Sequence, residues 1–192
     1  PQGTLHSLTK TASVALLALA AVWAGAPLLL VLALAACAVG DFCLSRDGDT
    51  YFMAGIAAFA LGHLGYIALF LRLSDSDPAR LLMMPHLAPT IVLLCIGLAM
   101  AALLAPRAGA LKIPVLCYIP IILGMGLAAL TVPAQGEHML LLPASLLFIL
   151  SDLVLAAETF VLKPDHPARR ATPYIIWVTY WGAQAGFLTT FA

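Results

Sequence analysis

Apolar residues along the chain fall into long runs that are separated by short polar or proline-containing turns. A helix that crosses a bilayer needs about 20 mainly apolar residues, and most of the runs approach that length. The expected spans cover residues 9–23, 27–45, 50–72, 80–104, 111–132, 139–162 and 172–191. Pro85 and Pro89 predict that the fourth span is kinked or begins with a short interfacial segment. The pattern therefore predicts an all-α fold, a transmembrane bundle of seven spans that forms one domain over residues 1–192.

Composition supports a membrane protein. Hydrophobic residues make up 63% of the chain and charged residues 9%, whereas a soluble domain has about 25% charged residues. The net charge is zero, so no nucleic acid partner is indicated. The 4 cysteines lie in apolar runs without a CxxC pair, which favours packing over a disulfide framework or a metal site. We expect the lipid bilayer as a partner and no cofactor.

Positive charges are unequally divided between the two ends of the predicted spans. With seven spans, Arg72 and Arg80 fall on one face, and the positive-inside rule makes the other face cytoplasmic. That face carries Lys10, Arg46, Arg107, Lys112, Lys163, Arg169 and Arg170. We expect a multi-pass protein of a bacterial inner membrane or an equivalent membrane. Any site built around residues 41 and 152 would lie in its cytoplasmic half.

Two aspartates inside apolar runs, Asp41 and Asp152, are the strongest functional signals. A charge at membrane depth costs several kcal/mol, so an intramembrane carboxyl is by default a hypothesis for a functional site. If the two carboxyls share a poorly solvated pocket, one stays protonated as a general acid while the other acts as a general base. A structural alternative is that each Asp caps a broken helix or pairs with Lys10.

Other polar residues inside the spans can complete a pocket. His63 is a candidate hydrogen-bond donor to an Asp or a substrate phosphate, with a structural role and metal ligation as alternatives; metal sites usually need three or more ligands. Lys10 can extend to the interface or balance the charge of Asp41. Glu158 points away from Asp152 on the same helix and is expected near the basic loop. The remaining candidates, each also explicable as structural, are Tyr66, Tyr118, Tyr180 and Gln184.

The order of these motifs resembles a known family, the YhhN-like membrane proteins or lysoplasmalogenases. The resemblance covers nearly the whole chain. It rests on Lys10, Gly40-Asp41-x-x-Leu44, Phe52-x-x-Gly55-x-x-x-Phe59-x-x-x-His63-x-x-Tyr66, Pro114-Val115-x-x-Tyr118, Leu147-Phe148-x-x-Ser151-Asp152-x-x-Leu155 and Tyr180-Trp181-x-x-Gln184. Members of the family usually have eight spans, one more than predicted here. This chain also has Lys10-Thr11 where Lys-Pro is frequent, and Tyr180-Trp181 where paired tyrosines are frequent.

The resemblance implies hydrolysis of the vinyl-ether bond of a lysoplasmalogen to a fatty aldehyde and glycerophosphocholine or glycerophosphoethanolamine. Two carboxyls suit this chemistry, because a vinyl ether is cleaved by acid through an oxocarbenium ion that must be stabilised and hydrated. We expect Asp152 to donate the proton and Asp41 to act as base, with the reverse assignment open. The substrate-binding residues would be Lys10, His63, Tyr66, Tyr118, Tyr180 and Gln184.

Two other classes of function fit part of the sequence. A ceramidase-like lipid hydrolase would use a histidine-bound metal, against which stands the single histidine deep in a span. A lipid or proton transporter would use Asp41 and Asp152 as a relay, but the chain lacks the internal repeat typical of many transporters.

Overall fold

A computed structural model describes residues 4–192, with side chains from residue 9 onward. Over that range the chain is helical and has no strand. Four short 3-10 helices lie between the main ones: η1 (Pro78–Leu82), η2 (Gly109–Leu111), η3 (Gly136–Leu140) and η4 (Pro167–Arg170). The α-helices are α1 (Thr4–Trp23), α2 (Leu28–Leu44), α3 (Asp49–Leu71), α4 (Leu87–Leu104), α5 (Lys112–Leu130), α6 (Leu141–Phe160) and α7 (Thr172–Phe191).

These helices match the predicted apolar segments in number and order. The largest difference lies in the fourth segment, where α4 begins at Leu87 and the preceding residues form η1. The Asp77 carboxylate accepts a hydrogen bond from the Ala79 backbone N–H at 2.9 Å and so caps η1. Proline lacks a backbone donor and disfavours a helical residue before it, which explains why the helix does not extend through Pro85. The short segment before the fourth helix is thereby confirmed.

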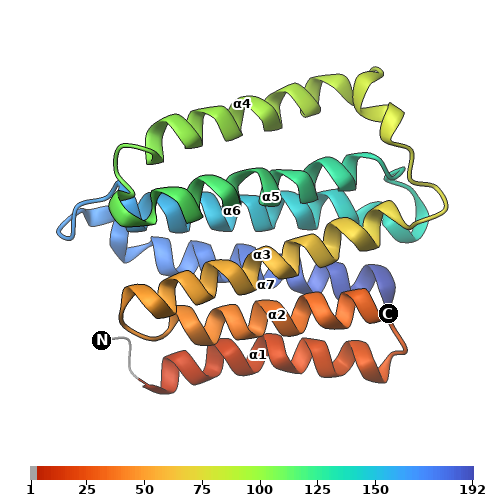
Figure 1. Cartoon of the computed structure of the whole chain (residues 1–192). Coiled ribbons are helices and arrows are strands. Elements are labelled where there is room, and N and C mark those ends of the chain that lie inside the picture. The colour runs from red at the N-terminus through yellow and green to blue at the C-terminus, as the bar shows by residue number, and fades with distance from the viewer. Residues whose placement is uncertain (1–3) are drawn as a thin grey trace.

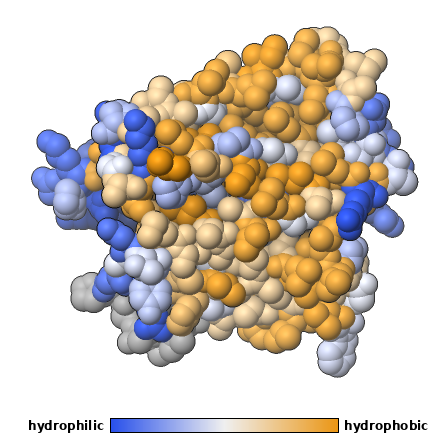
Figure 2. All heavy atoms as spheres, viewed as in Figure 1, coloured by the Kyte–Doolittle hydropathy of each residue, from blue (hydrophilic) through white to orange (hydrophobic). Residues whose placement is uncertain are grey.

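The apolar surface has the form expected of a protein embedded in lipid. Figure 2 shows hydrophobic residues across the middle of the molecule and hydrophilic residues gathered at its two ends. Within the described chain, four segments are long and apolar enough to cross a membrane, namely Asp49–Leu71, Leu87–Leu104, Gly109–Leu130 and Gly136–Phe160. The apolar parts of α1 and α2, Thr9–Trp23 and Leu28–Leu44, are shorter. The helical membrane bundle is thus supported, with four of the seven helices meeting the length and hydropathy of a full span.

Successive helices run in alternating directions, with α4 at one edge of the bundle and α1 at the other (Figure 1). The closest packing is between α2 and α3 and between α6 and α7, and α7 also packs against α1 and α2. One end of the bundle therefore brings together the start of α1, the end of α2, the end of α6 and the start of α7. Lys10 and Asp41 lie towards that end, and Asp152 lies nearer the middle of α6.

The contact between α2 and α3 depends on a missing side chain. A Cβ atom built on Gly62 of α3 would lie 2.6 Å from the Cys37 Sγ atom and 3.2 Å from the Ala33 carbonyl oxygen of α2. Small residues at a helix crossing let two backbones approach closely, which is a principal source of packing in membrane bundles. Gly62 therefore sets the distance between the helices that carry Asp41 and Phe59.

We predict that Gly62→Ala destabilises the protein by about 1–3 kcal/mol, the usual cost of overpacking, when unfolding is measured in mixed micelles. Cys37→Ala in the same chain should recover part of the loss, because it removes the Sγ atom but not the Ala33 carbonyl. Gly182→Ala is the control, since its Cβ would meet its nearest neighbour at 3.7 Å. Equal stability of the Gly62 and Gly182 variants would contradict this account of the crossing.

Candidate functional site

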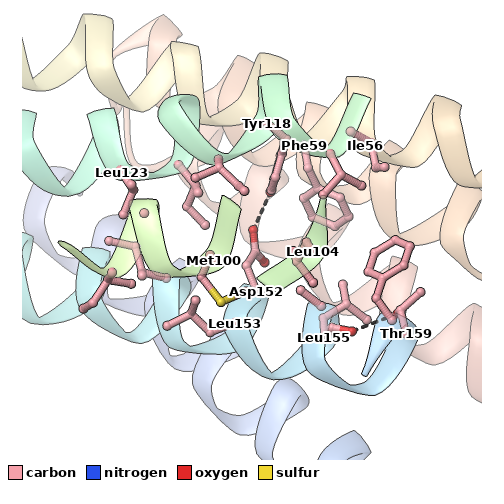
Figure 3. A pocket seen from close by; sticks show the side chains of 18 of the residues that line it. Ile56, Phe59, Met100, Leu104, Tyr118, Leu123, Asp152, Leu153, Leu155 and Thr159 are labelled. Atoms are coloured by element: carbon pink, nitrogen blue, oxygen red, sulfur yellow. Dashed lines mark hydrogen bonds between the residues drawn. The ribbon is translucent and has the colours of Figure 1, made fainter. Parts of the chain in front are cut away.

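Asp152 lies on α6 and is held by a tyrosine from α5. The Tyr118 hydroxyl donates a hydrogen bond to Asp152 Oδ2 (Figure 3). Both side chains are half-buried, so the carboxyl is shielded by protein without being sealed from open space. A buried carboxyl oxygen without a donor would cost on the order of 1–3 kcal/mol or more, and Tyr118 supplies that donor.

Asp41 has an equivalent arrangement, with a tyrosine from α7. The Tyr180 hydroxyl of α7 donates to Asp41 Oδ2 at 2.8 Å. The residue before it, Gly40, allows this position, because a Cβ there would lie 2.7 Å from the ring of Phe59. The Phe59 ring in turn packs edge-on against Tyr180, with ring centroids 5.8 Å apart. The sequence Gly40-Asp41 therefore brings the carboxyl beside an aromatic wall that only a glycine can approach so closely.

An apolar cavity lies on one side of Asp152 (Figure 3). It encloses about 780 Å³ of empty space, counting its open mouth. Residues from α2 to α6 line it, nearly all with apolar side chains, and Tyr118, Asp152 and Thr159 are the exceptions. The rest of its wall comprises Leu44, Phe52, Ile56, Phe59, Ile96, Gly97, Met100, Leu104, Val115, Ile119, Ile122, Leu123, Ile149, Leu153, Leu155, Ala156 and Phe160.

A second, polar cavity lies on the other side and contains both aspartates. It encloses about 720 Å³, again counting its mouth, between α1, α2, α3, α6 and α7. Its wall consists of Lys10, Asp41, Leu44, Ser45, Phe59, Ser151, Asp152, Leu155, Glu158, Pro173, Ile176 and Tyr180. The two carboxyls singled out from the sequence thus border one space.

The two cavities meet at Asp152. Leu44, Phe59, Asp152 and Leu155 line both of them, and Asp152 is the one ionisable side chain of the four. Asp41 borders the polar cavity alone. A long molecule with an apolar tail in one cavity and a polar head in the other would have its junction next to Asp152.

Three of the predicted binding residues lie outside both cavities. His63, Tyr66 and Gln184 are fully buried, and none lines either cavity. The Tyr66 hydroxyl donates to Gln184 Oε1. Since a carbonyl only accepts hydrogen bonds, the His63 Nδ1 that lies 2.6 Å from the Phe59 carbonyl oxygen carries the proton. Their predicted contact with substrate stays a prediction, and their observed place is the polar layer that supports the site.

His63 also approaches the first Tyr–Asp pair. Its Nδ1 lies 3.5 Å from the Tyr118 hydroxyl oxygen, and its ring packs against Phe148 with centroids 4.4 Å apart. His63 Nε2 and Gln184 Nε2 have no hydrogen-bond partner among the described residues. The histidine ring thus packs beside Tyr118, with ring centroids 5.5 Å apart, while the Tyr118 hydroxyl donates to Asp152.

Lys10 lies at the polar cavity, as expected, but its neighbour is an aromatic ring. Its Nζ atom lies 5.9 Å from the centroid of the Trp177 ring, a favourable position for a cation–π contact. It shares the lining of the polar cavity with Asp41 without a direct ion pair: among the described residues the one ion pair joins Arg169 and Glu158.

Sequence reasoning did not place Ser151 and Glu158 at the polar cavity, which both line together with Asp152. The expectation that Glu158 lies near the basic loop agrees with its ion pair to Arg169. Their signal was available, because Ser151, Leu155 and Glu158 follow one another at steps of four and three and so share a helix face.

The comparisons with known proteins identify the family of the chain. The model of the YhhN family matches residues 5–191. The chain belongs to the YhhN family. No curated protein and no solved structure matches it. The match covers every residue of both cavities. Within the described residues, no group of three or more His, Cys, Asp or Glu side chains is placed to hold a metal ion.

We predict that Tyr118→Phe and Asp152→Leu each destabilise the protein by about 1–3 kcal/mol, because each leaves a partly buried polar atom without a partner. The double variant should cost less than the sum, and a coupling of 0.5 kcal/mol or more by double-mutant cycle would be typical of residues in contact. Tyr51→Phe, at an exposed position of α3, is the matched control. Strict additivity would mean that the Tyr118–Asp152 bond does not stabilise the fold.

Proposed function

We propose that this YhhN protein is a lysoplasmalogenase, which hydrolyses the vinyl-ether bond of a lysophospholipid with Asp41 and Asp152 as its acid and base. The observation that carries the proposal is the position of Asp152 at the junction of the apolar and polar cavities. The alkenyl chain occupies the apolar cavity and the glycerophosphate headgroup the polar one. The bond to be broken, which links chain and headgroup, then lies beside the two carboxyls.

The order of groups in the substrate supports one assignment of roles. In a vinyl ether the carbon that accepts the proton is on the tail side, and the carbon that accepts water is attached to the ether oxygen, toward the headgroup. Asp152 borders the tail cavity, whereas Asp41 borders only the polar one. Asp152 is therefore the proton donor, and Asp41 is the base that activates water.

The reaction closes as a proton cycle between the two carboxyls. Protonated Asp152 gives its proton to the alkenyl carbon, and the resulting oxocarbenium ion is stabilised by the Asp41 carboxylate. Water adds to the carbon bound to the ether oxygen as Asp41 takes its proton, forming a hemiacetal. Asp152 then accepts the hemiacetal hydroxyl proton while Asp41 protonates the leaving glycerol oxygen. The aldehyde and the glycerophospho-alcohol depart, and both carboxyls return to their initial states.

Tyr118 and Tyr180 have positioning roles in this mechanism. Each hydroxyl donates to one carboxyl oxygen, Oδ2 in both cases, and so leaves the other oxygen, Oδ1, available to the substrate or to water. The two-carboxylate logic is that of glycosidases, which also pass through an oxocarbenium-like state.

We predict that the purified protein releases a fatty aldehyde from a 1-alkenyl lysophospholipid in detergent. Asp41→Asn and Asp152→Asn should each reduce kcat by about 10²–10⁴-fold, the usual contribution of a general acid or base. Asp47→Asn, exposed at the same end of the bundle, should leave the rate unchanged.

Three outcomes of that assay would contradict the proposal. Full activity of either Asn variant would remove that residue from the mechanism. Loss of activity with a chelator would favour a metal-dependent hydrolase instead. No aldehyde from a folded wild-type protein would favour a role in transport or in structure.

We also predict that narrowing the apolar cavity changes chain-length preference. Ala156→Phe adds a ring to its wall and should raise KM about tenfold for a long alkenyl chain while changing KM for a short one less than twofold. Leu146→Phe, at an exposed position on the same helix, is the control. An equal effect on long and short chains would place the tail elsewhere.

A further inference from the structure

The polar cavity contains two charged side chains that the proposed chemistry does not use. Its wall carries three carboxyl groups, those of Asp41, Asp152 and Glu158, and one amino group, that of Lys10. The reaction needs the two aspartates. Glu158 and Lys10 remain, with opposite charges, in a space that is open to a polar headgroup.

The described residues provide few polar contacts to the Glu158 carboxylate. Its side chain is 20% exposed, and its Oε1 lies 4.0 Å from Arg169 Nη2, at the outer limit of an ion pair. Its Oε2 is shielded and has no hydrogen-bond partner among the described residues. Arg169 is held mainly by the backbone, because its Nη1 donates to the carbonyl oxygens of Glu158 at 2.6 Å and Leu162 at 3.1 Å. A carboxylate oxygen in this state is stabilised by any ligand that brings an N–H donor with positive charge.

Lys10 comes from a different helix. It lies on α1 and Glu158 on α6, and both helices pack against α7, which contributes Pro173, Ile176 and Tyr180 to the wall. The contact of Lys10 with Trp177 keeps its ammonium group at the cavity without using it in an ion pair. The cavity therefore has a cation and an anion on separate helices.

We propose that Lys10 and Glu158 form the headgroup subsite, in which Lys10 binds the phosphate and Glu158 binds the ammonium group of a zwitterionic, ethanolamine-type lysophospholipid. This inference rests on the proposed function for the location of the lipid. A primary ammonium group at the exposed part of the Glu158 side chain supplies a charged N–H donor to this carboxylate. Lysolipids with a bare phosphate headgroup bind more weakly, because they bring a second negative charge toward three carboxyl groups and give nothing to Glu158.

The test measures binding independently of turnover. The ligands are two 1-O-alkyl lysolipids, which have no vinyl-ether bond to hydrolyse and differ only in a phosphoethanolamine or a bare phosphate headgroup. Affinity is followed by tryptophan fluorescence in detergent. Wild-type protein should prefer the phosphoethanolamine lipid. Glu158→Gln should lower the affinity for the phosphoethanolamine lipid about tenfold, which corresponds to about 1.4 kcal/mol. The affinity for the phosphate lipid should change by less than twofold or increase.

Other variants separate charge recognition from damage to the fold. Glu158→Gln keeps the two backbone bonds of Arg169, and Glu158→Asp, with a shorter carboxylate, should show a smaller loss of the same kind. Lys10→Met should weaken both lipids, since both carry phosphate. Glu137→Gln, exposed at the opposite end of the bundle, should change neither. An unchanged affinity in Glu158→Gln, or an equal loss for both lipids, would overturn the subsite.

The two proposals can fail separately. If the wild type releases no aldehyde but prefers the zwitterionic lipid through Glu158, the subsite holds and the proposed reaction is wrong. If aldehyde release depends on the aspartates while Glu158→Gln binds both lipids as the wild type does, the reaction holds and the subsite is wrong.

Discussion

A carboxyl group in an apolar bundle has to be hydrogen-bonded, and this constraint explains most of the site. Asp41 and Asp152 each meet it with a tyrosine hydroxyl from another helix. A tyrosine brings a donor without adding a charge, so the pair is stable in surroundings where an arginine or lysine would itself need solvation. The two bonds tie α2 to α7 and α5 to α6, so the site exists only in the assembled bundle.

The same constraint explains the polar layer behind the aspartates. Tyr66 and Gln184 join α3 to α7, and His63 places its Nδ1 near both the Phe59 carbonyl and the Tyr118 hydroxyl. Buried polar groups of this kind fix the register of neighbouring helices, because a shifted helix would leave several of them unpaired. The catalytic geometry proposed above therefore depends on residues that no substrate has to touch.

The sequence was sufficient to predict the helices, because the length of an apolar run is a local signal. It was also sufficient to single out Asp41 and Asp152, which border one cavity, because a carboxyl inside an apolar run is rare. It did not show that His63, Tyr66 and Gln184 lie outside both cavities. A polar residue inside a span gives the same sequence pattern whether its side chain faces a cavity or another helix. Glu158 lies near the basic loop, as expected, and pairs with Arg169. Its angle to Asp152 on the helix did not show that one cavity reaches both side chains. The wall shared by the two cavities depends on helix crossings such as that of Gly40 with Phe59, which no spacing rule predicts.

The helices contribute differently to the apolar cavity and to the hydrogen bonds of the aspartates. α4 contributes Ile96, Gly97, Met100 and Leu104 to the apolar cavity but none of the side chains in the Tyr–Asp pairs. It lies at the edge of the bundle (Figure 1) and packs mainly on α5. A change in the packing of α4 can therefore alter the size of the apolar cavity while the carboxyls and their tyrosines keep their positions. The two Tyr–Asp hydrogen bonds thus involve α2, α5, α6 and α7, whereas α4 contributes only to the wall of the apolar cavity.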